Sequence, residues 1–261
     1  MLAPPAPHSP NAEDIRTAYE IVAVLGVLLI LGVNGILIAA AMRFRTSRGR
    51  RAAAPRHRRR PQVWAGLAGG AVATFAFVVG VIFTERTRDV EPSGPDGLQA
   101  ASVRTAQLDL KLPPEAELLR IQATGQQWIW RFTYPGEDFE SFSYHELVAP
   151  VDTPVVLEVG STDVMHSFWV PELGGQVQAV PGRRNFAWFK ADKEGVYEGQ
   201  SGVFSGAAYA VMRVRVRVLS VTEYEAWLDA QQRAIRRGQA AVQSALGGDD
   251  AEPGTEPEAQ K

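Results

Sequence analysis

Two long uncharged runs dominate the first third of the chain. Residues 21–42 are interrupted only by one asparagine and three glycines, and residues 63–84 form a second run of similar length. A helix needs about 20 residues to cross the roughly 30 Å hydrocarbon core of a bilayer. We therefore predict an extracytoplasmic N-terminal segment over residues 1–17 and transmembrane helices over residues 18–42 and 61–85. A buried core helix is the alternative for either run, but two such runs in succession favour a membrane hairpin.

The residues around the hairpin set its predicted orientation. The connecting loop, residues 43–60, holds nine of the 27 basic residues, all of them arginine, and no acidic residue. Short loops rich in Lys and Arg stay on the cytoplasmic side of a membrane. Both termini, and everything beyond residue 85, are therefore predicted to lie outside the cytoplasm. Glu13 and Asp14 precede the first run, where a signal peptide would carry basic residues, although trimming of the first ten residues is left open.

The middle of the chain has the pattern of an all-β domain. Residues 86–101, rich in Pro, Gly, Ser and Asp, are typical of a linker, so we place the domain at residues 102–220. Short β-prone runs separated by turn residues predict a sandwich or barrel. The first two runs are expected to break near Gly125 and to end at Pro135-Gly136. The clearest strands are predicted at residues 118–123, 128–134, 153–159, 185–190 and 212–219.

The last of these runs alternates almost strictly. Val214, Val216 and Val218 face one side and three arginines face the other, as in a half-buried strand. The arginine face could bind an anionic partner, although any such strand needs a polar outer face.

The chain is predicted to end in a helix and a polar tail. Ser220 and Glu223 have the spacing of a capping box, which predicts an amphipathic helix over residues 221–246. Residues 247–261 are acidic and bear Pro and Gly, so we expect a disordered tail.

Composition narrows the possible chemistry. The 261-residue chain has no cysteine, which excludes disulfides, thiolate zinc sites, iron–sulfur clusters and cysteine nucleophiles. Its net charge of −2 hides a segregation, because outside the arginine loop the chain carries 18 basic and 29 acidic residues, or −11. The basic loop lies between two spans and lacks interleaved aromatic residues, so we expect no nucleic-acid partner.

Residues 161–212 carry the most specific pattern. They contain His166-Ser-Phe-Trp-Val-Pro-Glu-Leu, then Pro181-Gly-Arg, and Gln127-Trp128-Ile-Trp lies upstream. Together with the hairpin, these stretches resemble subunit II of the heme–copper oxygen reductases over roughly residues 15–220. The resemblance implies a two-helix hairpin followed by a cupredoxin-like β-sandwich outside the membrane. It also implies a catalytic subunit I that contains the hemes and one copper.

In cytochrome-c-oxidising members of that family, the sandwich holds the dinuclear copper centre CuA. Its ligands are two bridging cysteines, two histidines, a methionine and the backbone carbonyl of a glutamate whose side chain also helps to hold magnesium. By the resemblance, these positions are occupied here by Ser201 and Ser205, His166 and Tyr209, Met212, and Val203. Trp128 corresponds to the tryptophan that receives electrons from docked cytochrome c.

The side chains at these positions argue against a metal. Copper that cycles between two oxidation states needs soft, anionic thiolates, whereas a serine hydroxyl is hard and neutral. A phenol ordinarily titrates near 10, so tyrosine at position 209 is a poor replacement for an imidazole, and Val203 cannot ligate magnesium. We therefore expect no metal in this chain, with His166 and Met212 structural and Trp128 a surface anchor. A residual mononuclear copper site at His166, Met212 and Tyr209 is the alternative.

By the resemblance, we expect a non-catalytic subunit II of a quinol-oxidising heme–copper oxidase, an enzyme complex that builds a proton gradient. It would lie in the cytoplasmic membrane of a prokaryote, with lipid, subunit I and subunit III or smaller subunits as partners and quinol as electron donor to the complex. Three alternatives remain open. They are a nitric oxide reductase subunit, an oxidase subunit fed by cytochrome c through a partner heme domain, and a membrane-anchored cupredoxin-like binding module that is not part of an enzyme.

Overall fold

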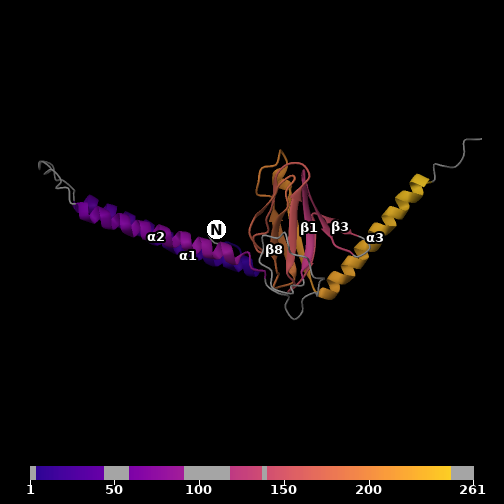
Figure 1. Ribbon diagram of the computed structural model, residues 1–261, viewed down its shortest axis with the longest axis horizontal. Coiled ribbons are helices and arrows are strands. Elements are labelled where there is room, and N and C mark those ends of the chain that lie inside the picture. Colours follow the sequence, from indigo (N-terminus) through magenta and orange to yellow (C-terminus); the bar gives the residue numbers. More distant parts are fainter. Residues whose placement is uncertain (1–3, 44–58, 91–117, 137–139, 248–261) are drawn as a thin grey trace, which may run out of the picture.

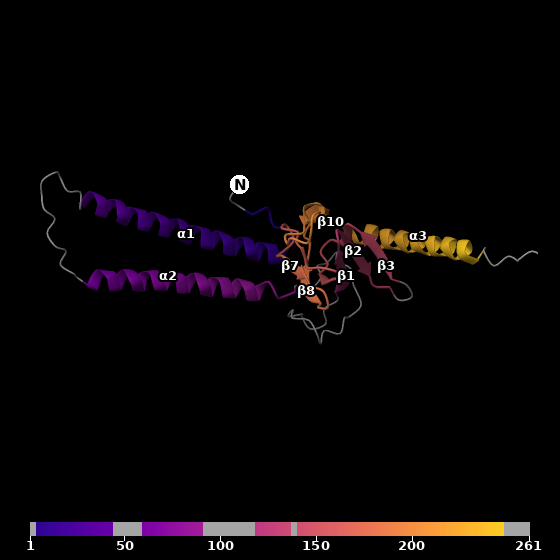
Figure 2. The same cartoon turned by 90° about the horizontal axis from the view of Figure 1, so that it is seen from above.

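The N-terminal part of the protein is a helical hairpin. The computed structural model describes residues 4–43, 59–90, 118–136 and 140–247. Helices α1 (Pro10–Arg43) and α2 (Arg59–Arg86) lie side by side (Figure 2). Helix α1 begins eight residues before the predicted span, and its first residue is a proline, which suits the first turn because no partner is needed for its missing N–H. Most of the predicted arginine loop and linker lies outside the described residues.

Both helices are long and apolar enough to cross a membrane. Their apolar side chains point outward, with Leu31 63% and Phe77 72% exposed. The 34 residues of α1 correspond to about 51 Å at 1.5 Å per residue. That length exceeds the roughly 30 Å hydrocarbon core. The first turns of α1 therefore extend beyond the apolar span.

The hairpin leads into a β-sandwich, as predicted. A five-stranded sheet has the order β3-β2-β1-β5-β8, a three-stranded sheet the order β4-β10-β9, and β6 pairs with β7. The strands are β1 (Leu119–Gln126), β2 (Ile129–Tyr134), β3 (Ser141–Tyr144), β4 (Glu146–Pro150), β5 (Val155–Ser161), β6 (His166–Phe168), β7 (Val177–Ala179), β8 (Asn185–Phe189), β9 (Gly195–Gln200) and β10 (Arg213–Leu219).

Alternating side chains from the two larger sheets form the core. Val214, Val216 and Val218 of β10 point inward, as the alternation predicts, and meet the aromatic side chains of β2. Strand β1 pairs in parallel with β5, and β4 pairs in parallel with β10. Parallel partners cannot be joined by a hairpin, so the chain passes from one sheet to the other between them. The cupredoxin-like sandwich expected from the sequence is confirmed.

Two details of the sheets differ from the sequence expectations. The predicted break near Gly125 does not occur, because Gly125 is inside β1 and pairs with Trp130. The turn instead falls at residues 127–128. Strands β3, β4, β6, β7 and β9 were not among the predicted strands, since they are short or contain Gly, Ser and charged residues.

The C-terminal helix α3 (Val221–Gly247) begins at the predicted capping box. Ser220 Oγ accepts a hydrogen bond from the Glu223 backbone N–H at 3.3 Å, and Glu223 Oε2 accepts one from the Ser220 backbone N–H at 3.2 Å. The first half of α3 packs on the sandwich through Tyr224, Trp227 and Leu228. Its second half projects away, with Leu246 73% exposed. The predicted tail falls outside the described residues apart from its first residue.

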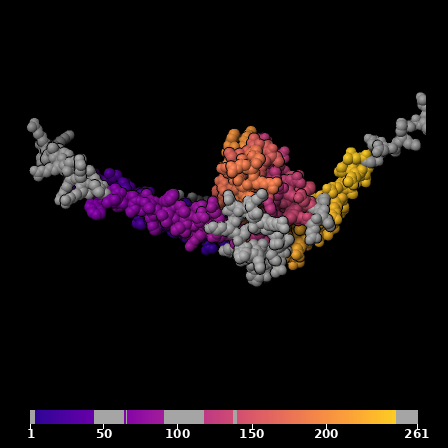
Figure 3. Space-filling view, in the orientation of Figure 1, coloured from indigo at the N-terminus to yellow at the C-terminus, as the bar shows by residue number. Residues whose placement is uncertain are grey.

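The three parts give the molecule an extended shape. The strands run across the direction of the hairpin, and the hairpin and α3 leave the sandwich on opposite sides (Figures 1 and 3). The sandwich therefore extends sideways from the end of the hairpin.

Replacement of Gly199 by alanine is expected to destabilise the sandwich. A Cβ atom at Gly199 would lie 2.4 Å from the Trp169 carbonyl oxygen and 2.7 Å from methyl groups of Val170 and Val214. Overpacking of a core costs about 1–3 kcal/mol, and the backbone contact places Gly199→Ala at the upper end of that range. Thermal unfolding of the full chain in detergent, followed by tryptophan fluorescence, measures the loss.

Gly160→Ala is the matched control for this substitution. A Cβ atom there would meet only the Arg183 carbonyl oxygen at 3.6 Å, which is an ordinary contact. Equal melting temperatures for the two variants would contradict the packing described for β9.

Candidate functional site

The predicted site residues gather at one end of the sandwich. His166 begins β6, and Ser201, Val203 and Ser205 lie in the loop between β9 and β10. Met212 precedes β10 and is fully buried, as is His166, while Ser201 and Ser205 are each 5% exposed. Hydrogen bonds connect this loop to β6 and to the turn that contains Trp128, so segments far apart in sequence meet here.

His166 is held on two sides. Its Nε2 atom is 2.8 Å from Asp163 Oδ1. Its ring lies over Gly125, where a Cβ atom would be 3.0 Å from the imidazole Cδ2, and it meets Trp130 edge-on with ring centroids 6.3 Å apart. Within the described part of the chain, the buried Nδ1 atom has no hydrogen-bond partner.

Asp163 fixes the position of His166. Besides the imidazole, its carboxylate accepts hydrogen bonds from the backbone N–H groups of Gln127 at 2.7 Å and Val164 at 2.6 Å. Desolvation raises the pKa of the Asp163 carboxyl, but the hydrogen bonds from His166 and the two backbone groups outweigh it and lower that pKa to about 2. The carboxylate is therefore ionised at neutral pH and links β6 to the β1–β2 turn.

Ser167 joins β6 to the β9–β10 loop through two hydrogen bonds. The Ser167 backbone N–H donates to Ser201 Oγ at 3.2 Å, and the Gly202 backbone N–H donates to Ser167 Oγ at 2.7 Å. The Ser201 backbone N–H also donates to the Met212 carbonyl at 3.0 Å. These three hydrogen bonds close the base of the loop.

The tip of the loop is held by the β1–β2 turn. Gln127 Nε2 and Trp128 Nε1 donate to the Ser205 carbonyl at 2.8 and 3.1 Å. Gly206 adopts a φ of 111°, which favours glycine, and a Cβ atom there would lie 2.9 Å from Gln127 Nε2. The half-buried indole of Trp128 thus contributes to holding the loop.

Val203 and Tyr209 lie nearer the surface than the other site residues. Both are half-buried, and Tyr209 belongs to a short 3₁₀ helix (Tyr209–Val211). Its ring packs against Phe204 at a centroid distance of 5.2 Å, and Phe204 itself is 73% exposed. The half-buried phenol is therefore packed against an exposed ring.

The donor set at this end of the sandwich does not fit a dinuclear copper centre. It offers one imidazole nitrogen that is not hydrogen-bonded, His166 Nδ1, one buried thioether, Met212, and neutral hydroxyls. Ser205 Oγ is buried without a hydrogen-bond partner in the described ranges, but an uncharged hydroxyl does not bridge two copper ions as a thiolate does. Among the described residues, no three His, Cys, Asp or Glu side chains are grouped as metal ligands.

The arginine face of β10 is partly neutralised by neighbouring strands. Arg215 pairs with Glu198 of β9 at 3.1 Å, and Arg217 pairs with Glu146 of β4 at 3.0 Å. These cross-strand pairs favour the simpler of the two interpretations, that of a polar outer face.

Sequence reasoning missed the residues that support the site. Gly125 was named only as a strand break and Gln127 only as part of a motif, and Asp163 was given no role, although each contacts a predicted site residue or its loop. Only Asp163 left a signal, because carboxylates are common hydrogen-bond partners of an imidazole nitrogen.

Comparisons with known proteins all lead to one kind of respiratory subunit. The family model of the periplasmic domain of cytochrome c oxidase subunit II matches residues 142–219. Cytochrome c oxidase subunit 2 of Alkalihalophilus pseudofirmus is 36% identical over 115 residues, which are 44% of this chain and 33% of that protein. Quinol oxidase subunit 2 of Bacillus subtilis is 37% identical over 139 residues, which are 51% of this chain and 43% of that protein. The chain thus spans less than half the length of these two relatives.

A solved structure matches over nearly its whole length. The periplasmic domain of subunit II of cytochrome oxidase of Bradyrhizobium japonicum is 32% identical, and the match covers 46% of this chain and 97% of that domain, with a TM-score of 0.44.

Replacement of Asp163 is expected to lower stability in a pH-dependent way. The pKa of this carboxyl is about 2 in the folded protein against an ordinary 3.8, so its contribution is complete above about pH 4 and is lost as the pH falls towards 2. Allowing for partial exposure, Asp163→Asn should reduce the free energy of unfolding by about 1–2 kcal/mol at pH 7. Chemical denaturation of the full chain in detergent at pH 7, 4 and 2.5 gives the values.

The control is Asp229→Asn on the exposed side of α3. It should leave the unfolding free energy unchanged at each pH. A difference between Asp163→Asn and the wild type that stays constant from pH 7 to pH 2.5 would be incompatible with the hydrogen bonding described here.

Proposed function

The chain belongs to the family of heme–copper oxidase subunit II, and from this premise we propose that it is a subunit II without CuA in a quinol-oxidising terminal oxidase. In this proposal it lies in the cytoplasmic membrane of a prokaryote, with the sandwich on the outer side over the catalytic subunit I. The complex reduces oxygen to water and conserves the energy as a proton gradient. This chain supplies no catalytic residue and serves as a structural cap on subunit I.

The observation that carries the proposal is the pair Ser201 and Ser205 at the positions of the two bridging thiolates. Ser201 Oγ is already engaged as a hydrogen-bond acceptor for β6, and the Ser205 carbonyl is held by the indole of Trp128. A CuA centre requires two sulfur atoms that are anionic, soft and shared between the metals. Neither serine supplies them, so the sandwich has no relay for electrons.

The remaining positions agree with this reading. The phenol of Tyr209, which replaces an imidazole, packs on the exposed ring of Phe204. Valine at position 203 removes the carboxylate that would help to hold magnesium. Electrons delivered to Trp128 would find no acceptor behind it, so docking of cytochrome c at this face would serve no purpose.

Electrons must then enter the complex elsewhere. A membrane quinol that is oxidised within subunit I provides such a route. Two relatives named quinol oxidase subunit 2, from Bacillus subtilis and Bacillus spizizenii, are 37% and 35% identical over 139 residues, which are 51% of this chain. A relative named cytochrome c oxidase subunit 2 is similarly close at 36%, so the ligand residues, rather than overall identity, favour quinol.

The purified complex is expected to use quinol and not cytochrome c. Oxygen consumption should be supported by a soluble quinol and should be negligible with reduced cytochrome c, because the protein lacks the copper relay. Metal analysis should give one copper per complex, that of subunit I, and the near-infrared spectrum should show no CuA band.

Each other outcome has a definite meaning. Turnover with reduced cytochrome c, or three coppers per complex, would overturn the proposal. Turnover with nitric oxide in place of oxygen would identify a nitric oxide reductase instead. A chain that purifies alone and without heme would indicate a binding module.

Restoring the thiolates should restore copper binding. If residues 201–212 keep the family's loop frame, the triple variant Ser201→Cys, Ser205→Cys, Tyr209→His supplies the missing ligands beside His166 and Met212. We expect it to bind two coppers per chain with strong visible absorption. The matched control Ser201→Ala, Ser205→Ala, Tyr209→His adds the histidine without sulfur and should bind none.

The triple variant tests whether residues 201–212 correspond, position by position, to the CuA ligand loop of the family. A folded triple variant that takes up no copper would show that the loop does not have the CuA geometry. Equal copper uptake by the triple variant and the control would show that the bound copper does not depend on the introduced thiolates.

A further inference from the structure

The residues around the start of α1 are buried against the sandwich. Ser9 is 4% exposed and Asn11 6% exposed, in the segment that the sequence predicts only as an extracytoplasmic N-terminus. Because the N-terminal turns of α1 extend beyond its apolar span, they reach the level of the sandwich. Residues 8–11, which we call the strap, lie along the end of β8 and the loop that precedes β7.

Hydrogen bonds attach the strap to the loop before β7 and to the residues that follow β8. The His8 backbone N–H donates to the Glu172 carbonyl at 2.8 Å, and the Asp192 backbone N–H donates to the His8 carbonyl at 3.1 Å. The Lys190 backbone N–H donates to Ser9 Oγ at 3.2 Å. Backbone groups next to a sheet edge need partners when they are buried, and the strap supplies partners to two such groups after β8.

Asn11 is the strap residue that bonds β8 directly. Its Nδ2 donates to the Trp188 carbonyl of β8 at 2.6 Å, and its Oδ1 accepts from Ser9 Oγ at 2.7 Å. A Cβ atom at Gly174 would lie 2.9 Å from Asn11 Nδ2, so the absence of a side chain there makes room for the amide.

His8 completes the attachment with its side chain. Its Nδ1 atom is 3.1 Å from Asp192 Oδ1. Its ring lies 5.4 Å from that of Tyr197 of β9, centroid to centroid. The strap therefore contacts residues of both larger sheets or their adjoining loops.

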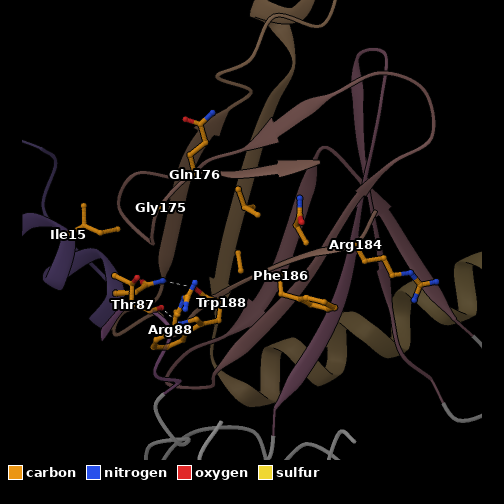
Figure 4. A pocket seen from close by; sticks show the side chains of 12 residues that line it. Ile15, Thr87, Arg88, Gly175, Gln176, Arg184, Phe186 and Trp188 are labelled. Carbon is orange, nitrogen blue, oxygen red and sulfur yellow. Dashed lines mark hydrogen bonds between the residues drawn. The ribbon is translucent and has the colours of Figure 1, made fainter. Parts of the chain in front are cut away.

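The second helix of the hairpin is attached at the same place. Trp188 Nε1 donates to the Thr87 carbonyl, just beyond α2, at 2.7 Å. The Trp188 carbonyl thus accepts a hydrogen bond from α1, and the Trp188 indole donates one to the residue that follows α2. Figure 4 shows Thr87 and Trp188 close together. Thr87, Ile15 and Trp188 also border a cavity of about 490 Å³ in the angle between hairpin and sandwich.

We propose that the strap, His8 to Asn11, is retained in the working protein and fixes the orientation of the sandwich over the hairpin. Cleavage after Ser9 would remove the acceptors of the Lys190 and Asp192 N–H groups and the hydroxyl that donates to the Asn11 amide, which holds the Trp188 carbonyl. The surface that the sandwich presents to its neighbours in the membrane is therefore set by residues at the beginning of the chain. This role is independent of the electron donor.

The first test is the N-terminus of the full-length protein isolated from membranes. Intact mass and N-terminal sequencing should give a chain that contains His8. A chain that begins at Pro10 or later would overturn the proposal.

The second test measures orientation directly. The chain has no cysteine, so spin labels attach only at introduced sites, for example Val78→Cys on α2 and Gln122→Cys on β1. In lipid nanodiscs the distance distribution between the labels should be narrow. It should become at least about twofold broader with Asn11→Ala, because one attachment of the hairpin to β8 is removed.

Asn34→Ala is the matched control, since Asn34 is on the same helix and its side chain donates to the Ile30 carbonyl of that helix rather than to the sandwich. It should leave the distribution unchanged. An equally narrow distribution for Asn11→Ala and the wild type would overturn the orienting role.

Ser9→Ala provides a test that a poorly folding Asn11 variant cannot obscure. It removes only the acceptor of the Lys190 N–H and the donor to Asn11. Hydrogen exchange at Lys190 should become about tenfold faster, as expected for the loss of one hydrogen bond of ordinary net strength. Exchange within β5 should not change, and unchanged exchange at Lys190 would count against the strap.

Discussion

The functional end of this protein depends on the hydrogen bonds that join β6 to the β9–β10 loop. Ser167 and the residues Ser201 and Gly202 exchange two hydrogen bonds across a separation of more than thirty residues, and Met212 holds the same loop from its other side. These contacts join β6 of the two-stranded sheet to the loop between β9 and β10 of the three-stranded sheet. They do so with groups that keep the same charge throughout a redox cycle. A loop closed in this way is suited to a structural role, which agrees with the proposed subunit that relays no electrons.

Much of the fold could be predicted because its signals are local. Uncharged runs of more than twenty residues, strict alternation around Val216 and the Ser220–Glu223 capping box each specify one element regardless of what packs on it. The short strands β6 and β7 could not be predicted in this way. His166 and Ser167 form a strand because of their partners Ala179 and Gln178, and those partners are distant in sequence.

Only part of the candidate site could be predicted from the sequence. The resemblance to a family gave the positions of His166, Ser201, Ser205 and Met212, and the structure brings the segments that bear them to one end of the sandwich. The residues that support them could not be found by motif. The need for glycine at position 125 becomes visible only in the structure, where the His166 imidazole lies over it. The attachment of the hairpin likewise becomes visible only through the hydrogen bonds of Trp188 to Asn11 and Thr87.

The start of α1 and the helix α3 each lie against one outer strand of the five-stranded sheet. The free side of β8 is covered by Asn11, whose amide bonds the Trp188 carbonyl. The other outer strand, β3, is met by α3, where Gln231 Nε2 donates to the Phe142 carbonyl at 2.7 Å. Exposed strand edges are templates for pairing with other chains, and a membrane surface confines such chains to two dimensions and raises their chance of encounter. Segments from the first and last described parts of the chain thus lie against both outer strands of this sheet, which limits the pairing of those strands with other chains.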